Sequence, residues 1–385
     1  MVLCMQKITL LALTKRKQVT LHKLLLRGLF GVLLSTLPFG ASVALANDKD
    51  KLETRYSVMS MKAAESLLVD AVNINGKLIV VGARGHILVS RDHGKSWKQA
   101  KVPTQNLITA IYFASSDVGW AVGHEAVILH TRDGGDSWDF QYGAPFLPAG
   151  YDDYAGDSAG DSAGVESDVS DEDLYAIDRS GSPLLDVWFK NEKEGFAIGA
   201  YGYFLHTSDA GKTWEDWSKR LGNIDGWHLN AISSIDGNLV YVVGEKGVLF
   251  RSTDGGDSWD VLTSPYDGSF FGMVVGPGIN EMIMFGLQGH VFRTSDSGDN
   301  WREIETGNQN GLMAGILYGD RGVILVGNGG VMMFSKDDGN SFVKQVTDDR
   351  NSIAGIVKTD KNKLILIGQG GVKLATPSKS LVGMD

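Results

Sequence analysis

Short apolar segments separated by turns recur along the chain, and one seventeen-residue stretch shows the pattern clearly. Residues 243–259 read VGEKGVLFRSTDGGDSW: the end of an apolar segment, a glycine turn, a second apolar segment and a polar octet that ends in Trp. The stretch recurs as VGARGHILVSRDHGKSW (81–97), VGHEAVILHTRDGGDSW (122–138), IGAYGYFLHTSDAGKTW (198–214), FGLQGHVFRTSDSGDNW (285–301), VGNGGVMMFSKDDGNSF (326–342) and, in a worn form, IGQGGVKLATPS (367–378). The chain therefore holds seven copies of one unit.

Each unit predicts four short β-strands. An apolar segment, a turn and a second apolar segment lead into the glycine turn, as in residues 184–198, and a few residues of mixed character follow the Trp. The leading glycines lie 41 to 45 residues apart, except for a gap of 76 between Gly123 and Gly199. A four-stranded unit of this period is typical of β-propeller blades. We expect an all-β fold, a seven-bladed β-propeller of four-stranded blades.

The two ends of the repeat array predict how the ring closes. The seventh unit stops near Thr376, after its third strand, and the strand-like segment Leu52 to Ser60 precedes the first unit. We expect this N-terminal segment to supply the fourth strand of the last blade, which would close the ring and remove the open sheet edges.

The polar octet has the form of an Asp-box and falls on the hairpin between the third and fourth strands. Its Asp can accept hydrogen bonds from backbone N–H groups in a tight turn, and its Gly supplies the backbone angles of that turn. The terminal aromatic residue, Trp in five units and Phe342 in the sixth, suits burial between neighbouring blades. An active site needs its groups once, whereas this octet recurs around the ring, so we interpret it as architecture.

The first 46 residues differ from the rest. They carry six bases and no acid, then an apolar run from Gly28 to Ala46 that ends in Ala-Leu-Ala. This is the order of a signal peptide, so we predict residues 1–46 as a leader cleaved after Ala46 and residues 47–385 as a single propeller domain. An uncleaved membrane anchor is the alternative. Export places the protein in the periplasm or outside the cell, or in the thylakoid lumen if the source is photosynthetic.

Composition narrows the function. Without the leader, 30 Lys plus Arg stand against 46 Asp plus Glu, a net charge of −16, which argues against nucleic acid as a partner. The only cysteine, Cys4, lies in the leader, so the exported part has no thiol for catalysis or metal binding. We expect no cofactor, no metal and a monomer.

The oversized gap is filled by an insert, residues 143–182, between the second and third blades. From Asp152 to Asp178 it holds ten acids and no base, which predicts a disordered, self-repelling loop. A flap that engages a basic partner, a weak calcium site at Asp157 and Asp161, and a plain solvated loop are the open interpretations.

Candidate binding residues fall into three groups. The turns between the second and third strands carry different residues at equivalent positions, among them Arg84, Tyr201 and Lys246, as a recognition surface or a drifting solvated loop would. Crossovers on the same face carry Trp217, Arg220, Trp227 and Tyr266, of types that anchor protein interfaces, although Trp227 could simply plug the channel. The third strands of four adjacent blades carry His130, His206, Arg251 and Arg293 at one height, either a docking stripe or charges that pair with their neighbours.

Enzymatic function is the alternative class. Sialidases carry Asp-boxes, but their Arg-Ile-Pro element occurs nowhere in this chain. Other Asp-box glycosidases use a pair of carboxylates in a cleft. A sialidase-like glycoside hydrolase or a glycan-binding protein is therefore retained as the second hypothesis, and we predict no catalytic residue.

With its repeated G-x-x-G-x-[IVL]-x-x-[ST]-x-D-x-G-x-[ST]-W units, the chain resembles the photosystem II stability/assembly factor family over roughly residues 52–378. The resemblance implies a non-enzymatic assembly or scaffold factor that binds a membrane protein complex of the thylakoid or cell envelope. It also implies a basic patch on the propeller, to which Arg251 and Arg293 correspond. The acidic insert, Val89, Phe334 and Ala375 depart from the family pattern.

Overall fold

The computed structural model describes residues 55–143, 181–276, 278 and 280–377. All of them belong to one compact unit, Thr54–Asp385. The predicted leader and most of the acidic insert, with its suggested calcium ligands, lie outside the described residues.

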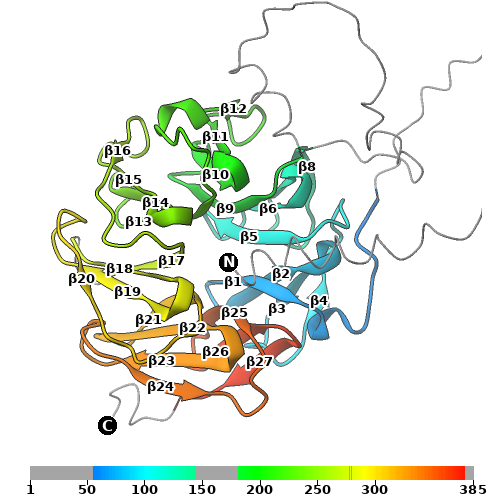
Figure 1. The fold of residues 1–385 in the computed structure, drawn as a ribbon. Helices are drawn as coiled ribbons and strands as arrows, with labels where there is room; N and C mark the ends of the chain where they lie inside the picture. Colours follow the sequence, from blue (N-terminus) through cyan, green and yellow to red (C-terminus); the bar gives the residue numbers. More distant parts are fainter. Residues whose placement is uncertain (1–54, 144–180, 277, 279, 378–385) are drawn as a thin grey trace, which may run out of the picture. The chain divides into compact units, whose positions relative to one another are not determined.

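The described chain forms seven antiparallel sheets that follow one another in sequence order around a ring, as the colours of Figure 1 trace. This confirms the seven-bladed propeller. Blades one to three contain β1(Leu68–Ile74), β2(Lys77–Gly82), β3(Ile87–Ser90) and β4(Lys98–Gln99); β5(Ile108–Phe113), β6(Gly119–Gly123), β7(Ile128–Thr131) and β8(Asp139–Tyr142); β9(Leu184–Phe189), β10(Gly195–Gly199), β11(Phe204–Thr207) and β12(Glu215–Asp216). Blades four and five contain β13(Leu229–Ser234), β14(Val240–Gly244), β15(Leu249–Ser252) and β16(Asp260–Val261); β17(Phe270–Val275), β18(Met282–Gly286), β19(Val291–Thr294) and β20(Arg302–Glu303). Blades six and seven contain β21(Leu312–Tyr318), β22(Gly322–Gly327), β23(Val331–Ser335) and β24(Val343–Val346); β25(Ile353–Lys358), β26(Leu364–Gly368) and β27(Gly371–Ala375).

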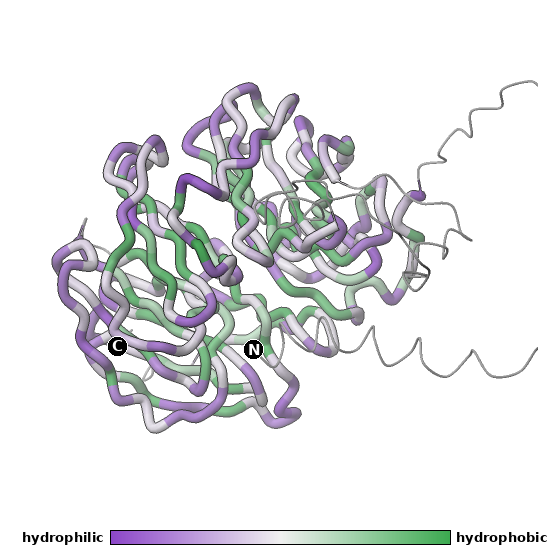
Figure 2. The backbone as a smooth tube through the Cα atoms, turned by 45° about the horizontal axis from the view of Figure 1, so that its top comes forward, coloured by the Kyte–Doolittle hydropathy of each residue, from purple (hydrophilic) through white to green (hydrophobic). Residues whose placement is uncertain are grey.

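Single 3₁₀ turns link the strands. One turn joins the second and third strands in six blades, and two more lie in connecting segments. They are η2(Ala63–Glu65), η3(Ala83–Gly85), η4(His124–Ala126), η5(Ala200–Gly202), η6(Ser218–Arg220), η7(Glu245–Gly247), η8(Leu287–Gly289) and η9(Asn328–Gly330). Figure 2 shows hydrophobic residues along the strands and hydrophilic residues at most of the turns.

The core is divided among the seams between blades. The second strands are apolar on both faces, so that Leu78 and Val80 pack toward blade seven while Ile79 and Val81 pack toward blade two. Seven buried clusters result, and each takes its buried members from two neighbouring blades. Burying a large apolar side chain in such a cluster stabilises the fold by about 1.5–3 kcal/mol.

Ring closure differs from the sequence prediction. Blade seven has three strands among the described residues, and Tyr56–Ser60 forms no strand. The segment instead follows blade one, because the Ser57 N–H donates to the Val102 carbonyl at 2.8 Å and the Gln99 amide holds both Ser57 and Val58 at 3.0 Å. For this part of the segment, the expectation of a fourth strand in blade seven is therefore wrong. The described closure is a side-chain cluster that joins blade seven to blade one.

The Asp-boxes are structural, as predicted. In blade four the Asp254 carboxylate accepts from Ser252 Oγ (2.7 Å), from the Ser258 N–H (3.0 Å) and from Ser258 Oγ (2.6 Å). Burial opposes ionisation here, but these hydrogen bonds outweigh it and hold the pKa of Asp254 at about 2. The closing Trp259 packs edge-on against Phe204 of blade three at 5.5 Å. The box thus shapes its hairpin and fastens one blade to the preceding one.

Candidate functional site

The turns between second and third strands present side chains on one face, here called the loop face. In five blades the middle residue of the turn is not glycine and has a left-handed φ of 55° to 59°: Arg84, Glu125, Tyr201, Lys246 and Gln288. This conformation costs an L-residue about 1–2 kcal/mol. The next residue is glycine in four of these turns; at Gly247, a Cβ would clash with the Tyr266 carbonyl oxygen of the following crossover. The strained backbone therefore displays five exposed side chains of different charge.

Aromatic and apolar side chains gather on this face where the crossover from blade three to blade four passes over the turns. The Asn223 amide braces the crossover by accepting from the Trp227 N–H (3.1 Å) and donating to the Trp227 carbonyl (2.8 Å). Lys246 Nζ lies 5.9 Å from the Trp227 ring centroid. Tyr201, 56% exposed, meets the His228 ring edge-on at 5.0 Å. With Ile224, which is 96% exposed, these residues are defined as the loop-face cluster: Tyr201, Ile224, Trp227, His228 and Lys246.

Two further predicted residues, Trp217 and Arg220, lie beside the outer strand of blade three. The Trp217 ring stacks on His206 at 3.7 Å, and the Arg220 guanidinium lies 3.6 Å from the Trp217 ring centroid. Trp217 is half-buried in its own blade, while Arg220 is exposed. A partner would thus meet the cation rather than the indole.

Tyr266 lies at the seam between blades four and five. Its ring is 4.5 Å from that of His290 and 5.7 Å from that of Phe292. It is half-buried and packs between neighbouring blades, so it supports the loop face.

The row of basic side chains is not an exposed stripe, which corrects the docking interpretation. His130 and His206 are buried, at 2% and 8% exposure, and burial lowers the pKa of His130 to about 4, so its ring is neutral at pH 7. Arg251 donates to the Ser297 carbonyl (2.9 Å) and pairs with Asp299 (2.7 Å). Both acceptors belong to the Asp-box turn of the next blade, and this turn lies over β15 at the level of Arg251. The alternative in which the charges pair with their neighbours holds for the arginines.

Arg293 repeats the arrangement one blade further on. Its Nε donates to the Asp338 carbonyl of blade six (2.9 Å), and a terminal nitrogen donates to the Glu281 carboxylate (2.9 Å). These arginines therefore bind blades together.

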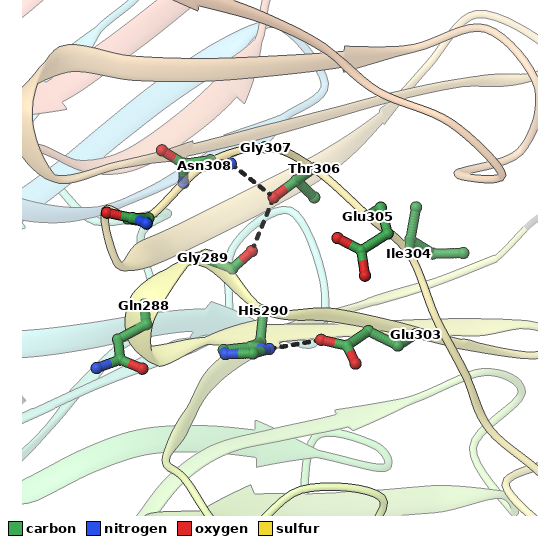
Figure 3. A pocket seen from close by; sticks show the side chains of 10 residues that line it. Gln288, Gly289, His290, Glu303, Ile304, Glu305, Thr306, Gly307 and Asn308 are labelled. Carbon is green, nitrogen blue, oxygen red and sulfur yellow. Dashed lines mark hydrogen bonds and ion pairs between the residues drawn. The ribbon is translucent and has the colours of Figure 1, made fainter.

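A polar hollow of about 610 Å³ lies on blade five between its turn and its outgoing crossover, and Figure 3 shows the residues that line it. His290 Nδ1 and Glu303 Oε1 lie 2.5 Å apart, and Thr306 Oγ1 donates to the Gly289 carbonyl at 3.1 Å. The hollow can accommodate a small polar group. The hollow was not predictable from the sequence, because its residues occupy ordinary positions of the repeat.

Side chains that tie the inner strands together were also missed. Asp70 Oδ2 accepts from the Ile111 N–H of blade two, and Asp186 Oδ2 accepts from the Ile232 N–H of blade four, both at 2.9 Å. The pKa of Asp186 is raised to about 7, because burial, helped by the charge of Asp70, outweighs the lowering effect of the backbone hydrogen bonds. Aligning the first strands could have found the pair, because the equivalent positions of the other five blades hold only Ala or Gly.

Within the described part of the chain, no group of three or more His, Cys, Asp or Glu side chains could hold a metal ion. The described residues also include no helix long and apolar enough to span a bilayer.

Comparison with known proteins places the chain in a family. The model for "Photosynthesis system II assembly factor YCF48" matches residues 95–149 and 175–316, about half of the chain. "Photosystem II assembly protein Ycf48" of Synechococcus sp. (strain JA-2-3B'a(2-13)) is 26% identical over 183 residues, which are 47% of this chain and 44% of the relative. The chain thus matches less than half the length of that relative.

Solved structures share the fold. "YCF48 bound to D1 peptide" superimposes with a TM-score of 0.60 at 18% identity, over 82% of this chain and 94% of that one. A GH74 xyloglucanase from Xanthomonas campestris also reaches 0.60, at 12% identity, over 83% of this chain and 53% of that one. The fold is therefore shared by assembly factors and enzymes, whereas the family model is specific: the chain belongs to the Photosynthesis system II assembly factor YCF48 family.

Proposed function

We propose that this protein is an exported, non-enzymatic assembly or scaffold factor that binds a membrane protein complex through its loop-face cluster. The observation that carries the proposal is the gathering of exposed Tyr201 and Lys246, from two turns, with Ile224 and Trp227 of the braced crossover. Aromatic residues with a neighbouring cation are the usual anchors of protein interfaces, and a rigid display limits the entropy lost on binding.

Family membership supports this function. The similar proteins are named as photosystem II assembly proteins, and one solved relative is described as bound to a D1 peptide. For this chain, we infer a partner of the same kind: an extended segment that a membrane protein presents to the exported side. The half-buried Arg251 and Arg293 are not part of the proposed contact, and Arg84 and Arg220 add exposed positive charge to that of Lys246.

Hydrolysis or glycan binding remains the competing function, because a xyloglucanase shares the fold. A fluorogenic glycosidase screen and a glycan array separate the two classes. Turnover of a glycoside would overturn the scaffold proposal.

The binding surface is tested with two probes: a fluorescently labelled D1 peptide, and solubilised membranes of the source organism. The test variant combines Tyr201→Ala, Trp227→Ala and Lys246→Glu. The matched control combines Lys95→Glu and Lys212→Glu, two exposed residues of the Asp-box turns. We expect the test variant to lose at least tenfold in affinity and the control to retain it. Equal binding by the wild type and the test variant would refute this surface.

A further inference from the structure

A row of large apolar side chains is exposed where the described chain begins. Tyr56, Val58, Met59 and Met61 are 43%, 63%, 64% and 103% exposed. Four such residues within six positions are costly to leave in water, and contiguous exposed apolar surface usually marks a contact site. Residues 55–62 are called the N-terminal strip.

The strip is held in place rather than loose. Ser57 is buried; its N–H donates to the Val102 carbonyl (2.8 Å) and its hydroxyl to the Arg84 carbonyl (2.9 Å). The Gln99 side chain accepts from the Ser60 N–H, and the Gln105 side chain donates to the Tyr56 carbonyl. With its backbone fixed to blade one, the strip directs Val58, Met59 and Met61 toward solvent.

Positive charge surrounds these apolar side chains on an otherwise acidic protein. Arg55 and Lys62 lie within the strip, and the exposed bases of the adjoining blade-one segments are Arg84, Lys98 and Lys101. Lys101 Nζ lies 4.4 Å from the centroid of the Tyr56 ring. Within residues 55–65 the single acid is Glu65. Apolar side chains with flanking bases match the interface of an anionic bilayer, where apolar burial and attraction to headgroups add.

We propose that the N-terminal strip docks the propeller on an anionic lipid surface. Exposures above 60% at Val58, Met59 and Met61 mean that these side chains project and do not line a groove, and flexible thioethers suit a fluid acyl region better than a shaped protein pocket. Because Ser57 bonds to the Arg84 turn, the strip lies beside the loop face. Docking would bring that face to the membrane in which the proposed partner is embedded.

Vesicle sedimentation tests the proposal with residues 47–385, which include the whole compact unit. The probes are phosphatidylcholine vesicles with and without 30% phosphatidylglycerol. One variant combines Val58→Asp, Met59→Asp and Met61→Asp; the other combines Lys62→Glu, Lys98→Glu and Lys101→Glu. The matched controls are Val343→Asp with Val346→Asp, exposed on β24, and a triple exchange of the exposed Lys95, Lys212 and Lys361 to Glu.

We expect the wild type to bind the anionic vesicles and to release them at high salt, with each strip variant losing at least tenfold in partition coefficient. Both controls and the variant that combines Tyr201→Ala, Trp227→Ala and Lys246→Glu should bind like the wild type, which separates this proposal from the proposed function. Unchanged melting midpoints would exclude misfolding, and Met59→Ser with Met61→Ser provides a milder second variant. Absence of wild-type binding, equal loss in the charge control, or a strip that retains a protein partner but no vesicles would overturn the proposal.

Discussion

Replacing Asp186 with asparagine tests whether a half-buried carboxylate at the seam of blades three and four makes the ring less stable at high pH. The pKa of Asp186 rises from 3.8 to about 7 in the folded protein, mainly through burial and then through Asp70. The folded state therefore binds this proton more tightly than the unfolded state. Stability falls as the pH rises from about 4 to about 7, because in this range the unfolded chain has lost the proton while the folded protein still holds it.

The size of the effect follows from the pKa change. About three pKa units at 1.36 kcal/mol each amount to on the order of 4 kcal/mol, fully expressed above pH 7. Asparagine stays neutral, but its Oδ1 can accept only one of the two N–H donors, from Val187 and Ile232, that the carboxylate serves. That mismatch costs about 1–3 kcal/mol at every pH. The diagnostic quantity is thus the change in stability between two pH values.

The assay is urea unfolding at pH 4.5 and pH 8.0, followed by tryptophan fluorescence. Between these values we expect the Asp186→Asn variant to lose less stability than the wild type, with Asp267→Asn, an exposed exchange, tracking the wild type. If the variant and the wild type show the same difference between pH 4.5 and pH 8.0, the reasoning about the seam carboxylate is wrong.

Three further predictions concern the blades and turns. Trp138→Ala should lower the free energy of unfolding, measured by chemical denaturation, by about 3–5 kcal/mol, because Trp138 is buried and packs edge-on against Phe113. In the same experiment Phe140→Ala, at an exposed position two residues on, should cost less than about 1 kcal/mol. Lys246→Gly should raise the unfolding midpoint, because it removes about 1 kcal/mol of conformational strain at a left-handed position. The same exchange should weaken partner binding in a peptide titration. A lower midpoint would contradict the strain argument. Arg293→Met should destabilise by about 1–3 kcal/mol, because Glu281 and the Asp338 carbonyl lose their donor, and a neutral outcome in thermal unfolding would show that this seam does not depend on the arginine.

Much of the fold follows from the sequence, because each copy of the sequence repeat forms one blade. The glycine turns, the short apolar segments and the Asp-box each fix a local geometry, as the bonds of Asp254 show. The exposed turn positions of Tyr201 and Lys246 were predictable for the same reason. Repetition at a fixed period places equivalent residues at one height of the ring.

The repeat period alone does not predict which neighbouring segment covers a residue at a given level of its strand. Arg251 and Arg293 lie at one level of their strands, but the next Asp-box turn arrives at that level and supplies their acceptors. The spacing of Tyr56–Ser60 before β1 suits a fourth strand in blade seven, yet the side chain of Gln99 offers the segment nearer partners on blade one. Such outcomes depend on contacts between blades, which a single unit does not encode.

The division of the core into seven seam clusters changes how a blade with fewer described strands is held in place. Blade seven has three strands among the described residues, and its unit at residues 367–378 has no Asp-box, so its seam with blade six relies on a buried side-chain cluster. In a linear array it would dissociate as a terminal unit. In the ring both of its neighbours are fixed by the other seams, so its two contact faces meet their partners at a high effective concentration. Circular closure thereby stabilises a seam that has no Asp-box to fasten it.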